Sequence, residues 1–198
     1  MVRRDKVIRS NRGTVFLLCT LLLSVLTVRG QEKPPQISER SCLIFTQKFY
    51  NWYIDITHRP APSSQGFGTW AGTLKYEGRS PFSPKIAQAL IASDAESKAN
   101  GDPSLDFDPV LYNPCIPSHY VVRSVTHKND HYWADVYDMS SESGCRTGRG
   151  ELPDVVAELV FEGGHWQFVN FHYPDPDPAH AAWVHDLLGL LEYEYQRK

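Results

Sequence analysis

The sequence predicts an α+β fold, because helical and extended segments are segregated along the chain. From Ile37 to about His58, apolar residues recur at three- and four-residue steps, as on the buried face of a helix. Most of residues 119–172 instead has the pattern of four short strands, rich in valine and aromatic residues and joined by turns. The expected order is therefore helix, loop, helix, four antiparallel strands and a closing helix.

Two helices are expected in the first half of the chain. The stripe of the first consists of Cys42, Phe45, Phe49, Trp52 and Ile56. A long loop over residues 59–82 follows, in which residues 68–76, "GTWAGTLKY", could add a short strand. Ser83 can cap the second helix, and Pro84 fits its first turn. The apolar side of this second helix is formed by Ile86, Leu90 and Ile91.

The connection to the sheet, "LDFDPVLYNP", predicts a turn followed by one helical turn, with Asp108 before Pro109 as the cap. The first two strands, 119–127 and 131–139, flank "KND", which is a hairpin signal. "EGG" then turns the strand at 154–161 into the last strand, "HWQFVNFHYP". These signals predict a sheet made of consecutive hairpins.

The last predicted helix follows "DPDP", with Asp177 as its cap and Pro178 at its first position. Its apolar stripe consists of Trp183, Leu187, Leu191 and Tyr195, extended by Val184 and Leu188.

Residues 1–30 have the three parts of a secretory signal. A basic start is followed by an uninterrupted apolar stretch over residues 14–28, and Val28-Arg29-Gly30 supplies small residues before a cleavage point. The apolar stretch is shorter than the roughly 20 residues of a spanning helix, although an uncleaved N-terminal anchor is the alternative. We expect residues 31–36 to be a linker and residues 37–198 a single domain. No later stretch is apolar enough to span a membrane, so we expect no membrane-spanning segment after cleavage of the signal.

Charge and cysteines limit the partners and the compartment. Without residues 1–30, 14 basic and 22 acidic residues remain, which gives a formal charge of −8. An acidic surface repels phosphate backbones, so nucleic acid is not an expected partner. Exported proteins keep disulfides. Cys115 and Cys145 lie at similar distances before and after the predicted hairpin turn, which favours their pairing and leaves Cys42 as a buried thiol.

Three stretches carry a resemblance to a known family. They are "FYNWYIDI" in the first helix, "LDFDPVLYNP" before the strands and "WQFVNFHYP" in the last strand. Together they resemble an exported bacterial family of unknown function that is similar in layout to the nuclear transport factor 2-like superfamily. The resemblance spans about residues 40–192. It implies a curved antiparallel sheet wrapped around the long first helix as a cone, here with an added C-terminal helix. That superfamily contains isomerases, cyclases, dehydratases and pure binding modules, so the fold does not choose a function.

In such a cone, alternation along the last strand would turn Trp166, Phe168 and Asn170 toward the first helix. Val169 and Phe171, on the opposite face, would be covered by the C-terminal helix through Trp183 and Leu187. His172 would lie at the cone rim, beside the segment that holds Asp106 and Asp108. The aromatic side chains could line a ligand pocket or simply form the core. The pocket candidates are Phe49, Trp52, Tyr53, Trp166, Phe168, Asn170 and His172.

The polar candidates each have a structural alternative. Asn170 and His172 could orient a polar ligand group, or they could tie down the chain where it leaves the sheet. Asp106 and Asp108 could form a carboxylate pair for acid–base work, or they could cap turns. His131, like His127 at the hairpin tip, is expected to be solvated. Neither a metal site nor a cofactor is expected, since ligand spacings and nucleophile motifs are missing from the sequence.

The sequence favours a periplasmic or secreted, non-catalytic binding or protein-interaction module of the bacterial envelope. Its partner would be a small apolar ligand or another envelope protein, with the aromatic stretch 66–76 as a contact, and a homodimer is the alternative assembly. The rival hypothesis is a small cofactor-free enzyme of the isomerase or cyclase type that uses Asp106 or His172 as its base.

The signal hypothesis makes one direct prediction. Cleavage after Gly30 should leave a soluble protein that begins at Gln31, because the small residues before this bond fit the signal-peptidase site. N-terminal sequencing of exported protein checks this start. A protein that keeps Met1 and remains in the membrane fraction would instead support the anchor.

Overall fold

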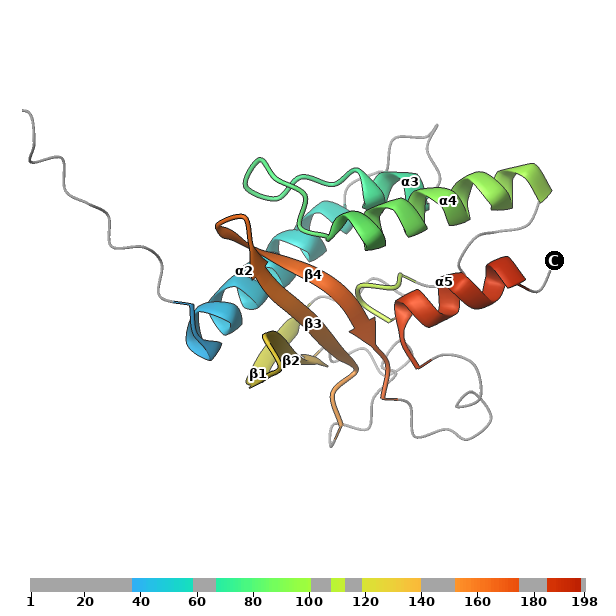
Figure 1. The fold of residues 1–198 in the computed structure, drawn as a ribbon. Helices are drawn as coiled ribbons and strands as arrows, with labels where there is room; N and C mark the ends of the chain where they lie inside the picture. The colour runs from blue at the N-terminus through green and yellow to red at the C-terminus, as the bar shows by residue number, and fades with distance from the viewer. Residues whose placement is uncertain are drawn as a thin grey trace, which may run out of the picture. The chain divides into compact units, whose positions relative to one another are not determined.

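The computed structural model describes residues 37–58, 67–100, 108–112, 119–139, 152–174 and 185–196. The predicted signal, Asp106, Cys115 and Cys145 lie outside these residues. The described part has the predicted α+β organisation, with a four-stranded antiparallel sheet and helices beside it (Figure 1). Its elements are α2 (Glu39–Thr57), α3 (Phe67–Gly72), α4 (Pro84–Asn100), β1 (Tyr120–Lys128), β2 (His131–Asp138), β3 (Val155–Glu162), β4 (His165–His172) and α5 (Leu187–Gln196).

Helix α2 confirms the first predicted helix and begins at a reciprocal cap. The Ser38 hydroxyl accepts a hydrogen bond from the Ser41 amide at 3.2 Å, and the Ser41 hydroxyl accepts one from the Ser38 amide at 3.0 Å. This pairing satisfies backbone donors that the first turn of a helix leaves without a partner. The buried face of the helix then carries Cys42, Thr46, Phe49, Tyr50, Tyr53 and Ile54.

The four strands pair in chain order, β1-β2-β3-β4, as the hairpin signals predict. Asn129 and Asp130 form the turn between β1 and β2, with φ of 52° and 63°. Gly163 and Gly164 form the turn between β3 and β4, also at positive φ, where glycine has no steric cost. Burial alternates along β2, so one face of the sheet packs on the core and the other faces away from α2.

The predicted alternation along β4 is wrong beyond Phe168, because the strand contains a bulge. Leu159 pairs with Phe168 but Glu158 pairs with Asn170, so Val169 is an extra residue between two pairs. One inserted residue reverses which later side chains face the core. Phe171 therefore joins Phe168 on the core side, with ring centroids 5.2 Å apart. Asn170 and His172 turn to the outer face, the face of the sheet directed away from α2.

Both edges of the sheet are partly covered by other segments. On β1, the Gln47 side chain of α2 donates to the Tyr120 carbonyl at 3.0 Å and accepts from the Val122 amide at 2.8 Å. On β4, the Phe168 amide donates to the Pro81 carbonyl, and its carbonyl accepts from the Ser83 amide, each at 2.8 Å. These contacts pair backbone groups that an edge strand would otherwise leave open.

The expected short strand at 68–76 is instead mostly helix, since α3 spans residues 67–72. This helix packs on α4, which begins after Ser83 as predicted; the Ile86 amide donates to the Ser83 hydroxyl at 3.4 Å. A Cβ on Gly72 would lie 2.6 Å from the Ala87 carbonyl oxygen. The close approach of the two helices thus overrides the local strand preference. Ile91, predicted on the apolar side of α4, is 37% exposed.

The C-terminal helix begins later than predicted. Asp186 is outside the helix and caps α5, because its carboxylate accepts from the Gly189 amide at 2.9 Å. The predicted start at Asp177 and Pro178, and the contacts expected of Trp183, lie outside the described residues. The predicted stripe is retained in part, since Leu187 and Leu191 are buried in the core.

The centre of the core is a packed set of aromatic rings. The Phe49 ring of α2 lies with its centroid 4.5 Å from that of Phe168 on β4, and both side chains are completely buried. Phe82 and Phe45 also contact Phe168, at 6.2 and 5.7 Å between centroids. Phe168 is therefore the point at which α2, β4 and the segment before α4 meet.

Truncation of Phe168 should be costly. We expect Phe168→Ala to lower the free energy of unfolding by about 3–5 kcal/mol, because the change removes buried surface and leaves a cavity among rigid rings. Chemical denaturation monitored by circular dichroism measures this. Ile44→Ala is the control: Ile44 is on the same helix as Phe49 but 45% exposed, and should cost no more than about 0.5 kcal/mol. Similar losses for the two variants would mean that Phe168 is not a core residue.

Candidate functional site

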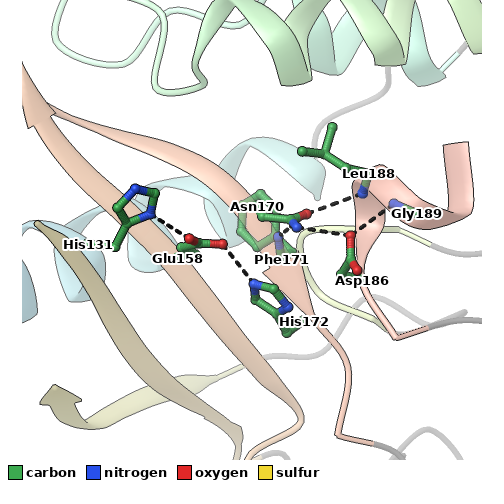
Figure 2. Close-up of polar contacts among 8 residues, drawn as sticks. All are labelled: His131, Glu158, Asn170, Phe171, His172, Asp186, Leu188 and Gly189. Carbon is green, nitrogen blue, oxygen red and sulfur yellow. Dashed lines mark hydrogen bonds and ion pairs between the residues drawn. The ribbon is translucent and has the colours of Figure 1, made fainter. Parts of the chain in front are cut away.

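A three-residue polar chain crosses the outer face of the sheet. Glu158 on β3 lies between His131 on β2 and His172 on β4 (Figure 2). Its Oε1 is 2.5 Å from Nδ1 of His131, and its Oε2 is 2.9 Å from Nε2 of His172. The three side chains share one face because Glu158 alternates with core-facing Ala157 and Leu159, and because the bulge turns His172 outward.

The geometry of this chain assigns a role to each nitrogen. A carboxylate only accepts, so each imidazole donates an N–H to Glu158. Nε2 of His131 and Nδ1 of His172 are the ring nitrogens that do not bond Glu158. Glu158 is the most covered of the three, with 13% of its side chain exposed against 41% for His131 and 27% for His172. The Trp133 ring, 4.8 Å from the His172 ring, packs beside it.

His131 was expected to be solvated at the hairpin tip; its side chain is 41% exposed, and it also bonds Glu158, a contact that was not expected. His127 is exposed but stacks on Tyr132, with ring centroids 4.3 Å apart. Glu158 itself was not singled out from the sequence. The alternation of "DVVAELVF" contained the signal, since it places one acid on the outer face among apolar residues.

Asn170 belongs to a second polar cluster, which joins β4 to α5 (Figure 2). Its amide donates to Oδ1 of Asp186 at 2.9 Å, and its carbonyl oxygen accepts from the Leu188 amide at 3.2 Å. Burial acts to raise the pKa of Asp186, but hydrogen bonds from Gly189 and Asn170, with the charge of His172, lower it overall. Asn170 therefore ties down the chain after the sheet, which is the structural alternative stated for it.

Four tyrosine hydroxyls hold the segment 108–112. We call Tyr50, Tyr53, Tyr120 and Tyr173 the tyrosine clamp. Tyr50, Tyr120 and Tyr173 donate to the carbonyls of Val110, Leu111 and Pro109, at 2.9, 2.7 and 2.8 Å. Tyr53 donates to the Asp108 carboxylate at 3.1 Å. The clamp residues come from α2, β1 and the end of β4, so this short segment is fixed to three parts of the fold.

Asp108 is the predicted turn cap. Its Oδ1 accepts from the amides of Val110 and Leu111 at 2.8 and 3.2 Å. Burial raises the pKa of Asp108 to about 6, against the lowering effect of these hydrogen bonds and that of Tyr53. Because both oxygens are already bonded within the fold, Asp108 serves as a structural acceptor. A pair with Asp106 falls outside the described residues.

The aromatic pocket candidates lie mostly in the packed core. Phe49, Tyr53 and Phe168 have no exposed surface, and Trp166 is 7% exposed. Trp52 is half-buried, with its ring centroid 5.0 Å from that of Tyr76. The structure thus brings Phe49, Tyr53 and Phe168 together as rings in contact. It places Asn170 and His172 on the other face of the sheet.

Cys42 is buried on α2, as predicted for the thiol left over. Burial raises its pKa to about 12, partly offset by a hydrogen bond with Thr46, so it is a protonated core residue and a poor nucleophile. Within the described part of the chain, no group of three or more histidines, cysteines and acids is arranged to hold a metal ion. The contacts that join His131, Glu158 and His172 are hydrogen bonds.

Comparison of the chain with protein-family models, curated proteins and solved structures finds no match. Among the described helices, none combines the length and the apolar character needed to cross a membrane. The side-chain contacts described above are therefore the basis for proposing a function.

Asp108 should make stability depend on pH. Its folded pKa of about 6 lies above its ordinary value of 3.8, so the folded state binds more protons between these values and stability falls as pH rises through this window. Asp108→Asn keeps an acceptor oxygen but cannot ionise. Between pH 4 and pH 7, the free energy of unfolding of the wild-type protein should fall by about 1–3 kcal/mol relative to that of this variant. Urea unfolding of both proteins at each pH measures the difference, in which other titrations cancel. A difference that is constant with pH would contradict this role.

Proposed function

We propose that the protein is an exported, non-catalytic binding or protein-interaction module of the bacterial envelope. The observation that supports this most is the filled interior between α2 and the sheet. An enzyme or ligand-binding protein of the cone type needs space beside its inner strand face. Here that space is occupied by the contact between Phe49 and Phe168 and by the rings around them.

We also propose that the sheet forms the cone of the nuclear transport factor 2-like layout. The support is that one helix, α2, contacts both edge strands. Helix α2 contacts β1 through Gln47 and β4 through Phe49, although these strands are at opposite edges of the sheet. Adjacent strands are about 4.8 Å apart, so a flat sheet would separate these edges by roughly 14 Å. A sheet that curves around α2 accounts for both contacts of one helix.

The state of the polar candidates also supports a non-catalytic role. Nε2 of His172 is bonded to Glu158, on the outer face and away from the aromatic interior. Asp108 is bonded by two backbone amides and Tyr53. The enzyme hypothesis needs a base with a free atom that faces a substrate, whereas both oxygens of Asp108 and Nε2 of His172 are already bonded within the fold. Catalysis by Asp106 would rest on residues outside the described part.

We propose another envelope protein as the partner, with the stretch 66–76 at the contact, of which the structure describes residues 67–76. The rings of this stretch pack inward, since Trp70 lies with its centroid 5.9 Å from that of Tyr53 and Tyr76 lies against Trp52. They hold the backbone of the stretch against the core, while Thr73 and Lys75 are exposed. A rigid stretch with exposed polar positions loses little entropy on binding.

Site-specific photo-crosslinking tests this proposal. A benzophenone amino acid at Lys75 should give one discrete heterologous product in cells that make the protein. The same group at Lys48, an exposed position on α2, is the matched control and should give none. A product from both positions, or from neither, would reject the contact at 67–76. A product at twice the protein's own mass, formed also by the purified protein, would replace the heterologous partner with a homodimer.

A further inference from the structure

The described part of the chain contains a groove far from His172, at the opposite end of β4. It has a volume of about 300 Å³. Its walls come from α2, from residues 76–81 and from Gly164 with the first two residues of β4. Pockets for small molecules span roughly 300–1,000 Å³, so the groove is at the lower end of that range. The residues that matter for its chemistry are Phe45, Tyr76, Glu77, Arg79, His165 and Trp166.

The walls of the groove are fixed by the core. The Phe45 ring lies with its centroid 5.8 Å from Tyr76 and 5.7 Å from Phe168. Trp166 packs edge-on against Tyr132 and Phe161, at 4.8 and 5.2 Å. The amide of Tyr76 donates to the carbonyl of Arg79 at 2.8 Å, and the reverse bond is 3.1 Å, so the turn that carries Arg79 is closed. The groove is therefore largely formed before any ligand binds, which lowers the cost of binding.

The polar side chains at the groove differ in how many partners they already have within the fold. The Tyr76 hydroxyl forms a hydrogen bond with the Glu77 carboxylate. Burial, the charge of Glu77 and this hydrogen bond, in that order, raise the pKa of Tyr76. Nε2 of His165 accepts from the Gln167 amide at 2.7 Å, and Nδ1 lies 3.3 Å from the Gly163 carbonyl, so both ring nitrogens already have partners within the fold. Arg79 is exposed and, among the described residues, has no carboxylate within ion-pair distance.

We propose that this groove binds a small organic carboxylate with a flat apolar body. A guanidinium offers parallel N–H donors that match a carboxylate, and the aromatic walls match an apolar ring. Glu77 lines the same groove, so the attraction for an anion comes from direct contact with the Arg79 guanidinium. The inference rests on the proposed binding role and adds the ligand class to it.

Phenylacetate and phenylacetamide are a matched pair of probes, because they have nearly the same shape and only the first is charged. In a two-dimensional ¹H–¹⁵N NMR titration, phenylacetate should cause saturable shifts of the Trp166 indole and Gly164 amide signals. Phenylacetamide should bind at least about tenfold more weakly, since it cannot form the charge-assisted pair with Arg79. Equal binding of both probes, or no saturable shift with phenylacetate, would overturn the proposal.

Arg79→Gln should weaken phenylacetate binding by about tenfold or more. Arg123→Gln is the control, because it removes the same charge from a residue that stacks on Tyr137 in the sheet, at 4.0 Å. It should leave the affinity unchanged. Equal losses in both variants would mean that overall charge, and not this groove, attracts the anion. Binding of acetyl-Gly-Gly-Phe at least tenfold more tightly than phenylacetate would reassign the site to a peptide C-terminus and reject the small-molecule ligand.

Failure of this inference can be told apart from failure of the proposed function. Loss of phenylacetate binding with an intact cross-link from position 75 would reject only the ligand assignment. Loss of the cross-link with saturable, Arg79-dependent phenylacetate binding would reject only the protein partner.

Discussion

The bulge at Val169 decides both the core and the outer face of the sheet. Up to Phe168, alternate residues of β4 face α2; beyond the bulge the parity is reversed, so that Phe171 also enters the core. The same reversal brings His172 to Glu158 and Asn170 to Asp186. A regular strand would bury an amide and an imidazole against aromatic rings, where each polar group without a partner costs about 1–3 kcal/mol. The inserted residue separates apolar and polar side chains and so makes the packed interior compatible with a polar strand end.

Two further constraints fix how the sheet can be used. Gln47 covers backbone groups at the start of β1, and the 81–83 segment covers β4 at Phe168. The carbonyl of His185 accepts from the amide of Tyr173, which extends the cover of this edge to the end of the strand. A partner that adds a strand to a sheet needs open backbone groups along an edge. Where these groups are already paired, recognition has to use side chains and turns, which agrees with a contact through exposed loop positions or the Arg79 groove.

Much of the fold follows from local patterns in the sequence. The stripe of α2, the cap at Ser83, the cap at Asp108 and both hairpin turns use interactions among residues that are close in sequence, so they can be predicted. Three of the departures from prediction involve distant contacts. The 68–76 stretch becomes α3 because Gly72 allows a close approach to α4. The parity of β4 changes because β3 pairs with it around an extra residue. The His131–Glu158–His172 chain requires three strands in register, and no single stretch of sequence contains that information.

The hydrogen bonding of the buried polar side chains is relevant to function. Among the described residues, no buried side-chain nitrogen or oxygen lacks a hydrogen-bond partner. Catalytic groups are often held in costly surroundings, with shifted pKa values and a free functional atom facing substrate. Asp108 has the shifted pKa, but its oxygens are occupied by the 108–112 turn and the tyrosine clamp. Asp108, Asn170 and the tyrosine clamp therefore position backbone segments. The exposed Arg79 lies at the surface, in a groove whose walls are fixed by the same aromatic core.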